Sequence, residues 1–185
     1  AKDIVDISQY KKYNISESYI DRIEVIENGV HINPLISKDF KKKLQILFSG
    51  RNSQEKRPNI FFEIAKKIPD SSFHIAGDDF RNYEDHPNVT KYGKLNENKI
   101  EELYKENNIL LITSYREGFP LVVMEAMSNG IVCICTNVGS IRDHIIDGIN
   151  GFVIDNSENE CQIIDNFVDR IKQLDENRIL LEKMS

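Results

Sequence analysis

Apolar residues along this chain form short unbroken runs, which alternate with longer stretches where apolar and polar residues repeat at helical spacing. The short runs predict buried strands at 44–50, 108–114 and 130–137, further strands at 72–77, 88–94 and 150–155, and a strand or extended entry at 23–28. The amphipathic stretches predict helices at 59–68, 96–107, 120–129 and from 159 onward. Strands that are apolar on both faces and alternate with helices are typical of a parallel sheet covered on both sides. The pattern therefore predicts an α/β fold with a doubly wound parallel sheet.

Composition narrows the class of protein without identifying a function. The 185 residues suit one domain better than two, and 40% are hydrophobic while 29% are charged. A net charge of -6, with acidic and basic residues interspersed, argues against a general nucleic-acid binder. No apolar run approaches membrane-spanning length. Cys133 and Cys135 are expected to be reduced core residues because they fall in a predicted buried strand, and no second Cys/His pair has the spacing of metal ligands.

The segment YREGFPLVVMEA, at 115–126, carries two glutamates at the ends of an apolar stretch. Pro120 suits the first turn of a helix, whose free N–H groups and positive dipole end would form an anion site. Glu125 lies ~7–8 Å deeper along the helix axis, where it could accept hydrogen bonds from a ribose. Glu117 precedes the helix and could bind the hydroxyls of a sugar. The alternative is that Glu117 is a solvated loop residue and Glu125 lies on the solvent side of the helix.

Two other loops carry weaker signals at the expected carboxyl edge of the sheet, where open α/β sheets bind ligands. In SGRNSQEK, Arg51 and Lys56 follow a predicted strand and could together neutralise a diphosphate. An ordinary exposed loop would explain these two charges as well. In TNVGSIRD, Gly139 and Ser140 open another helix, and Gly139 permits close approach of a ligand to the backbone. A plain turn between strand and helix accounts for that glycine nearly as well.

Taken in order, the motifs ILFSGR, FHIAGDD, NVTKYGKL, YREGFPLVVMEA and TNVGSIRD closely resemble the C-terminal, donor-binding half of retaining GT-B glycosyltransferases, the glycosyl transferases group 1 family. The resemblance covers about 25–153, and its core is the pair of glutamates separated by seven residues. It implies a Rossmann-like half of a GT-B fold. It also implies an enzyme that transfers a hexose or N-acetylhexosamine from a UDP- or GDP-sugar to a glycan or lipid-linked acceptor in envelope polysaccharide synthesis. Competing readings are a non-catalytic nucleotide-sugar-binding module and another GT-B enzyme such as a nucleotide-sugar epimerase.

The resemblance also implies roles for individual residues. Glu117, Arg51 and Lys56 would be catalytic, the first on the donor sugar and the basic pair on the diphosphate. Glu125 would bind the ribose, and the backbone of Tyr92, Gly93, Lys94 and Leu95 would meet the nucleobase. The remaining donor-binding residues would be Gly50, Ser114, Gly118, Phe119, Pro120 and Leu121. No cofactor and no metal is expected.

The same likeness divides the chain into a lead-in at 1–40, from an N-terminal acceptor domain, and a donor-binding domain at 41–185 that we expect to be cut short at its C-terminal helix. Such a fragment should at best bind donor, and should transfer little or nothing. The expected partners are the nucleotide-sugar and an acceptor held by the other domain, with no nucleic acid. The family also implies a cytoplasmic location at the inner face of the membrane, with peripheral membrane contact in the full-length protein.

Three departures from the family pattern leave the donor's sugar and base open. Arg57 and Pro58 follow Lys56, where the family commonly has glycine. The turn after Gly77 reads Asp-Asp-Phe, where a Gly-x-Gly-Pro turn is usual. Gly139-Ser140 replaces a pair of glycines.

Overall fold

The computed structural model describes residues 29–30, 38–118, 120–156 and 159–185. The predicted strand at 23–28 and nearly all of the predicted lead-in segment therefore lie outside the described residues. So does Phe119, one of the predicted donor-binding positions.

Six parallel strands form one sheet in the order β3-β2-β1-β4-β5-β6. The strands are β1 Gln45–Gly50, β2 Ser72–Gly77, β3 Val89–Gly93, β4 Ile109–Ile112, β5 Val132–Thr136 and β6 Gly151–Ile154. The helices are α2 Pro58–Lys67, α3 Glu97–Glu106, α4 Leu121–Ser128, α5 Ile141–His144, α6 Glu160–Glu176 and α7 Arg178–Met184. The predicted doubly wound, Rossmann-like sheet is confirmed, since this strand order is the one that defines the fold.

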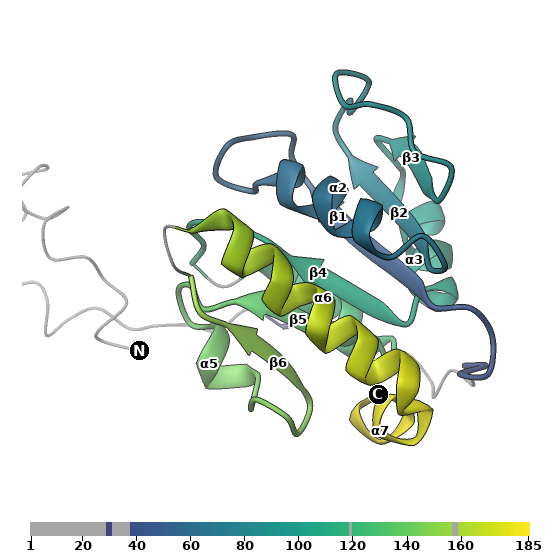
Figure 1. The fold of residues 1–185 in the computed structure, drawn as a ribbon, viewed down its shortest axis with the longest axis vertical. Coiled ribbons are helices and arrows are strands. Elements are labelled where there is room, and N and C mark those ends of the chain that lie inside the picture. The colour runs from purple at the N-terminus through teal and green to yellow at the C-terminus, as the bar shows by residue number, and fades with distance from the viewer. Residues whose placement is uncertain (1–28, 31–37, 119, 157–158) are drawn as a thin grey trace, which may run out of the picture.

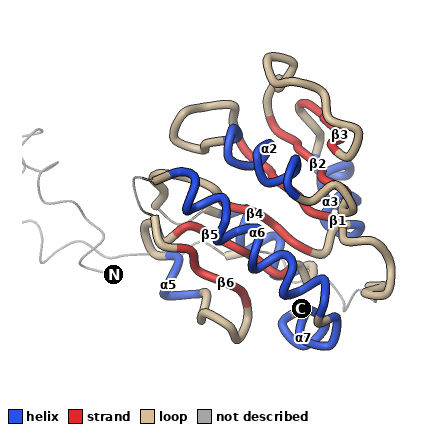
Figure 2. Tube along the Cα trace, viewed as in Figure 1, coloured by secondary structure: helices blue, strands red, loops and turns tan. Residues whose placement is uncertain are grey.

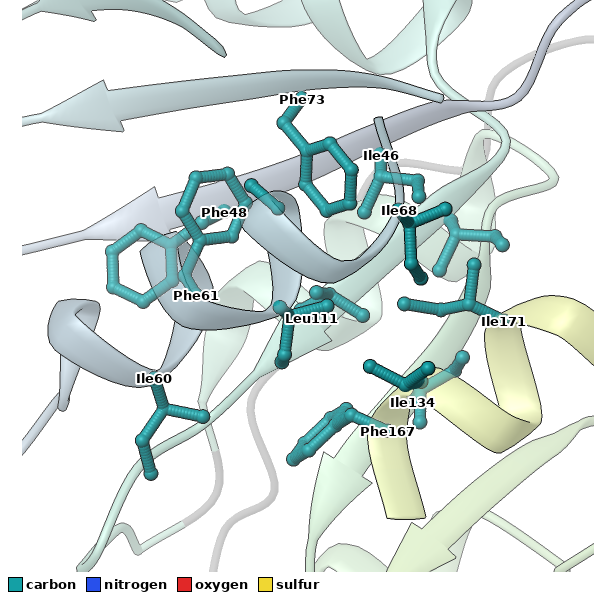
Figure 3. Packing of buried hydrophobic residues seen from close by; sticks show 14 of the residues in the cluster. Ile46, Phe48, Ile60, Phe61, Ile68, Phe73, Leu111, Ile134, Phe167 and Ile171 are labelled. Atoms are coloured by element: carbon teal, nitrogen blue, oxygen red, sulfur yellow. The ribbon is translucent and has the colours of Figure 1, made fainter. Parts of the chain in front are cut away.

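Alternation of side chains along each strand supplies both apolar faces of the sheet. Ile46 and Phe48 of β1 point to one face, whereas Leu47 between them points to the other. The first face is covered by α2, α6 and α7, and Figures 1 and 2 show α2 and α6 crossing in front of the strands. Figure 3 shows Phe61 of α2 and Phe167 of α6 packed against strand residues there. The second face is covered by α3, α4 and α5.

The local elements follow their sequence signals closely, with small differences at the ends. Asn96 is the N-cap of α3, as predicted, and its side chain accepts a hydrogen bond from the Lys99 amide at 3.0 Å. Pro120 is the N-cap of α4 and not part of its first turn. The long predicted C-terminal helix is divided at Asn177, which ends α6 and caps α7.

The two cysteines of β5, Cys133 and Cys135, are free and buried, as predicted. No helix among the described residues is both long enough and apolar enough to cross a membrane.

The direction in which successive strands are added to the sheet reverses between β1 and β4, and a ligand crevice is expected at this point of the carboxyl edge. After β1 the chain enters α2 on one face, whereas after β4 it enters α4 on the other face. The two outgoing loops therefore separate above neighbouring strands, the arrangement in which open α/β sheets bind ligands. All the predicted loops that the structure describes begin at this same edge.

Candidate functional site

Three predicted site residues meet in the crevice between β1 and β4. Glu117, in the loop before α4, accepts a hydrogen bond from the Ser114 hydroxyl at its Oε1, with a donor–acceptor distance of 2.7 Å. The same oxygen forms an ion pair with Lys56 Nζ from the loop after β1. The side chains of Lys56 and Glu117 are only 20% and 10% exposed. The structure thus joins a residue predicted for the diphosphate to one predicted for the donor sugar.

Backbone contacts hold these two loops together below the ion pair. The Thr113 hydroxyl donates to the carbonyl oxygens of Lys56 and Arg57, at 2.8 and 3.0 Å. The Tyr115 amide donates to the carbonyl oxygen of Glu55 at 2.7 Å. The acceptor in each of these bonds is a backbone carbonyl oxygen. The bonds therefore set the relative position of the two loops, whatever conformation the Lys56 and Glu117 side chains adopt.

The mouth of α4 opens beside Glu117. The helix has eight residues and no acidic residue in its first turn, and its N-cap Pro120 offers no side-chain hydrogen bond. The first N–H groups of a helix have no intrahelical acceptor, and the helix dipole makes this end partly positive. Leu121 is 45% exposed, and a Cβ added to Gly118 would meet nothing within 4 Å. Neither Gly118 nor Leu121 covers the mouth, and the anion site predicted there stays a prediction.

Glu125 lies on the same helix, beside a groove between α3 and α4. Its Oε2 accepts a hydrogen bond from the Tyr104 hydroxyl at 2.8 Å. Burial raises the pKa of Tyr104, and the hydrogen bond to Glu125 raises it further. The groove has a volume of about 480 Å³ and is lined by Gly29, Val30, Glu97, Ile100, Glu101, Tyr104, Leu121, Glu125, Ser128 and Asn129. Glu125 therefore faces a partly enclosed hollow and not open solvent.

Gly139 makes the close backbone approach that the sequence suggested, but its neighbour is another loop of the protein. Its φ is +53°, and a Cβ there would lie 1.8 Å from the Gly118 carbonyl oxygen. The next amide, of Ser140, donates to that same oxygen at 3.0 Å. The loop after β5 is thus pressed against the loop that carries Glu117.

Arg51 is exposed and makes no hydrogen bond or ion pair with another described residue. It directly follows Gly50, the last residue of β1, so it lies on the same loop as Lys56 although only Lys56 reaches Glu117. The carbonyl oxygen of Gly50 lies close against Gly77 of β2, since a Cβ added to Gly77 would lie 1.9 Å from that oxygen. This loop is therefore anchored at its start, with the Arg51 side chain in solvent.

Asp78 and Asp79, in the turn after β2, bond to other residues of the protein. Asp78 Oδ2 accepts from the Asn52 amide at 2.9 Å, and the Asp79 carbonyl accepts from Asn52 Nδ2 at 2.7 Å. The hydrogen bonds of Arg81 lower the pKa of Asp79 to about 2. In the described part of the chain, no three His, Cys, Asp or Glu side chains are grouped so that they could hold a metal ion.

The stretch predicted to meet a nucleobase lies at the end of β3. Tyr92 is 39% exposed and packs edge-on against His74, with ring centroids 5.6 Å apart. Tyr92, Gly93 and Lys94 line a hollow of about 510 Å³, together with Gly77, Asp78, Asp79, Phe80, Arg81 and Lys91. Leu95 instead packs on the apolar face shared by α3 and α4. Tyr92 and Glu125 line different hollows, so the prediction that one nucleotide contacts both stays a prediction.

Sequence reasoning missed two residues that support the site, Tyr104 and Arg57. Tyr104 looked like an ordinary apolar position of an amphipathic helix, and nothing in its spacing indicates a hydrogen bond to Glu125. Arg57 did carry a signal, because it occupies the position where glycine was expected after Lys56. Its backbone is left-handed, with φ +48°, and its side chain is buried.

The family model described as Glycosyl transferases group 1 matches residues 34–185 of the chain. A relative from Escherichia coli, UDP-Gal:alpha-D-GlcNAc-diphosphoundecaprenol alpha-1,3-galactosyltransferase, is 32% identical over 198 residues, which cover 92% of this chain and 50% of that protein. The lipopolysaccharide 1,6-galactosyltransferase of Salmonella typhimurium is 31% identical over 146 residues, covering 70% of this chain and 41% of that protein. The chain thus spans half or less of the length of these two relatives.

Among solved structures, the apo form of the lipopolysaccharide outer core galactosyltransferase WaaB superimposes with a TM-score of 0.70 and 26% identity. The match covers 96% of this chain and 54% of that one.

Proposed function

The chain belongs to the glycosyl transferases group 1 family, and we propose that it is the donor-binding half of a retaining glycosyltransferase. The proposed donor is a UDP-hexose, and the proposed acceptor is a glycan or lipid-linked sugar of an envelope polysaccharide. The name of the Escherichia coli relative supports this choice of donor, because it specifies UDP-Gal. The name of the Salmonella relative supports the acceptor class, because it specifies lipopolysaccharide.

One observation carries the proposal: Lys56 and Ser114 converge on Glu117 directly before the mouth of α4, and Glu125 faces a groove further along the same helix. A diphosphate at the mouth would meet the helix N–H groups and the Lys56 ammonium. The pentose would then reach Glu125, whereas the hexose on the other side of the diphosphate would reach Glu117. This order of contacts follows the order of groups in a nucleotide-sugar.

The proposed reaction needs no protein nucleophile. The acceptor oxygen bonds to the anomeric carbon on the face from which the diphosphate oxygen leaves, and a diphosphate oxygen takes the proton of the acceptor hydroxyl. Negative charge grows on the diphosphate as the bond breaks, so cations and helix N–H groups held at that position stabilise the transition state. Lys56 has three N–H donors and can contact the diphosphate while it stays near Glu117. Exposed Arg51 would supply the second cation.

We assign acceptor binding to a part of the protein that this sequence does not contain, which fits the share of the relatives that the chain covers. Reaction at a lipid-linked acceptor would take place at the cytoplasmic face of the membrane. Peripheral contact with that membrane would then come from the acceptor-binding part.

Calorimetric titration of the chain with UDP, UDP-galactose, GDP and ADP tests the donor site. We expect selective binding of the uridine nucleotides, strongly weakened by Glu125→Ala and by Arg51→Ala. Glu63→Ala, which removes an exposed carboxylate on α2, is the control and should bind as the unaltered protein does. Equal, weak binding of all four nucleotides that survives both site substitutions would contradict the proposal.

A further inference from the structure

Arg57 has a backbone conformation that its residue type disfavours. It is the one non-glycine residue with positive φ in the described part of the chain, at φ +48° and ψ +55°. The next residue, Pro58, adds a further restriction on the backbone before it. The Arg57 side chain is also buried, since the residue is only 6% exposed. A buried guanidinium is unfavourable unless its N–H groups are bonded. Glycine would avoid both costs, whereas arginine adds the hydrogen bonds of its guanidinium.

The guanidinium bonds to the loop that follows β4. Its Nε donates to the carbonyl oxygen of Thr113 at 2.6 Å, and its Nη2 donates to that of Ser114 at 3.1 Å. In return, the Thr113 hydroxyl donates to the carbonyl oxygens of Lys56 and Arg57. Each loop therefore uses a side chain to hold the backbone of the other.

Asn156, after β6, connects this pair of loops to a third. Its Oδ1 accepts from Arg57 Nη2 at 2.7 Å, and its Nδ2 donates to the Tyr115 carbonyl oxygen at 3.0 Å. On the other side, the Thr136 hydroxyl donates to the Ser114 carbonyl oxygen at 2.6 Å. Arg57 thus lies at the centre of a network that joins the carboxyl ends of four strands.

The held residues are immediate neighbours of the catalytic candidates. Arg57 follows Lys56 in the chain, and its Nη2 holds the backbone of Ser114, whose hydroxyl contacts Glu117. The flexible stem of Lys56 does not itself fix the spacing of the two loop backbones, so other bonds must hold Lys56 and Glu117 at a constant distance.

We propose that Arg57 is a positioning residue for the donor diphosphate, which holds the loop after β4 against the loop after β1 so that Lys56 stays beside Glu117 and the mouth of α4. The role rests on the proposed function. Arg57 Nε and Nη2 are occupied by two carbonyl oxygens and an amide oxygen of the protein, so we assign Arg57 a positioning role and not direct contact with the donor.

The test compares Arg57→Gly and Arg57→Lys with the unaltered protein in calorimetric titrations with UDP and with UMP. Arg57→Gly suits the left-handed backbone but lacks the guanidinium, so we expect its Kd for UDP to rise about tenfold, a change of about 1.4 kcal/mol. The Kd for UMP should change by less than about twofold. UMP lacks the second phosphate, so it depends less on the loops that Arg57 positions. Millimolar guanidinium chloride, far below denaturing concentrations, should restore part of the lost affinity for UDP.

Arg57→Lys keeps the positive charge but lacks the planar guanidinium, whose Nε and Nη2 reach separate acceptors, and it should lose affinity for UDP as well. It also provides the measurement if Arg57→Gly fails to fold, which thermal unfolding would reveal. Arg178→Lys, at the junction of α6 and α7, is the control and should bind UDP normally.

Unchanged UDP affinity in both Arg57 variants, or equal losses for UDP and UMP, would overturn the positioning role. Absence of UDP binding by the unaltered protein would instead contradict the proposed function, and the positioning role with it.

Discussion

The Tyr104 hydroxyl donates a hydrogen bond to Glu125 Oε2 at 2.8 Å, which joins α3 to α4 on one side of the groove. Tyr104 is only 4% exposed, so its ring is fixed by packing and presents the hydroxyl in one position. One carboxylate oxygen of Glu125 is thereby held, and the side chain is directed toward the groove before any ligand binds. Preorganisation of this kind lowers the entropy lost on binding.

On the proposed function, Tyr104→Phe should therefore weaken binding of a uridine nucleotide without abolishing it. A hydrogen bond to a charged group contributes about 1.5–3 kcal/mol, and only part of this affects the ligand, so we expect a loss of about three- to tenfold in affinity. Calorimetric titration of Tyr104→Phe and of Glu125→Ala measures the two affinities for the nucleotide, and Glu125→Ala should lose more affinity. Tyr115→Phe, at a tyrosine that is 60% exposed, is the control. A larger loss in Tyr104→Phe than in Glu125→Ala would contradict this order.

The raised pKa of Tyr104 predicts a dependence of stability on pH in alkaline solution. Burial and the bond to Glu125 keep the phenol protonated in the folded state, whereas an unfolded tyrosine ionises with a pKa of about 10. The unfolded state therefore binds fewer protons above that pH, so the free energy of unfolding falls as pH rises. The contribution of Tyr104 to the free energy of unfolding is complete below about pH 10, and it decreases as the pH rises from there toward the pKa of Tyr104 in the folded state.

Urea unfolding at a series of pH values from 8 to 11 measures this slope. Tyr104→Phe should show a shallower decrease than the unaltered protein. Burial also raises the pKa of Tyr83 and Tyr92, so a residual slope common to both proteins is expected. Identical slopes in the two proteins would show that Tyr104 ionises as readily in the folded state as in the unfolded chain.

Gly139→Ala should destabilise the protein much more than Gly148→Ala. Both glycines have positive φ, at +53° and +76°, so each alanine carries the left-handed penalty of about 1–2 kcal/mol. A Cβ at Gly139 would in addition lie 1.8 Å from the Gly118 carbonyl oxygen, whereas one at Gly148 would meet nothing within 4 Å. We expect a further loss of about 1–3 kcal/mol for Gly139→Ala from overpacking against the loop that carries Glu117. Equal losses in urea unfolding would argue against that contact.

The Lys56–Glu117 ion pair should couple the two residues energetically. Both side chains are largely buried, so removal of one partner leaves a poorly solvated charge. A double-mutant cycle with Lys56→Met, Glu117→Gln and the combined variant should give a coupling energy of about 1–2 kcal/mol in urea unfolding. The exposed pair Lys66–Glu63 provides the comparison and should couple by less than about 0.5 kcal/mol. Similar coupling at the two pairs would indicate that the crevice is open to water.

The fold was predictable because its signals repeat along the chain. Apolar runs such as 108–114 and 130–137 are too short for buried helices and match β4 and β5 to within a few residues. The pattern also placed Glu117 before a helix and Glu125 within it, since the proline, the glycine and the helical spacing all lie in one segment. The break at Asn177 was missed because the polar residues there also fit one continuous helix.

The contacts within the site were not predictable in the same way. Lys56 and Glu117 are 61 positions apart, and their loops become neighbours only because β4 is placed beside β1 in the sheet. The bond from Tyr104 to Glu125 joins two helices whose packing is decided by the sheet beneath them.

The sequence alone determined the order of strands and helices, the burial of strands such as β4 and β5, and the presence of acidic and basic groups in the loops that follow strands. Those features depend on residues close together in the chain, where apolar spacing and turn residues act directly on local conformation. The tertiary structure decided that Lys56 meets Glu117, that Tyr104 directs Glu125 and that Arg57 ties the loops together. Such bonds depend on the distance between segments that only the assembled sheet brings within reach, and they leave no periodic trace in the order of residues.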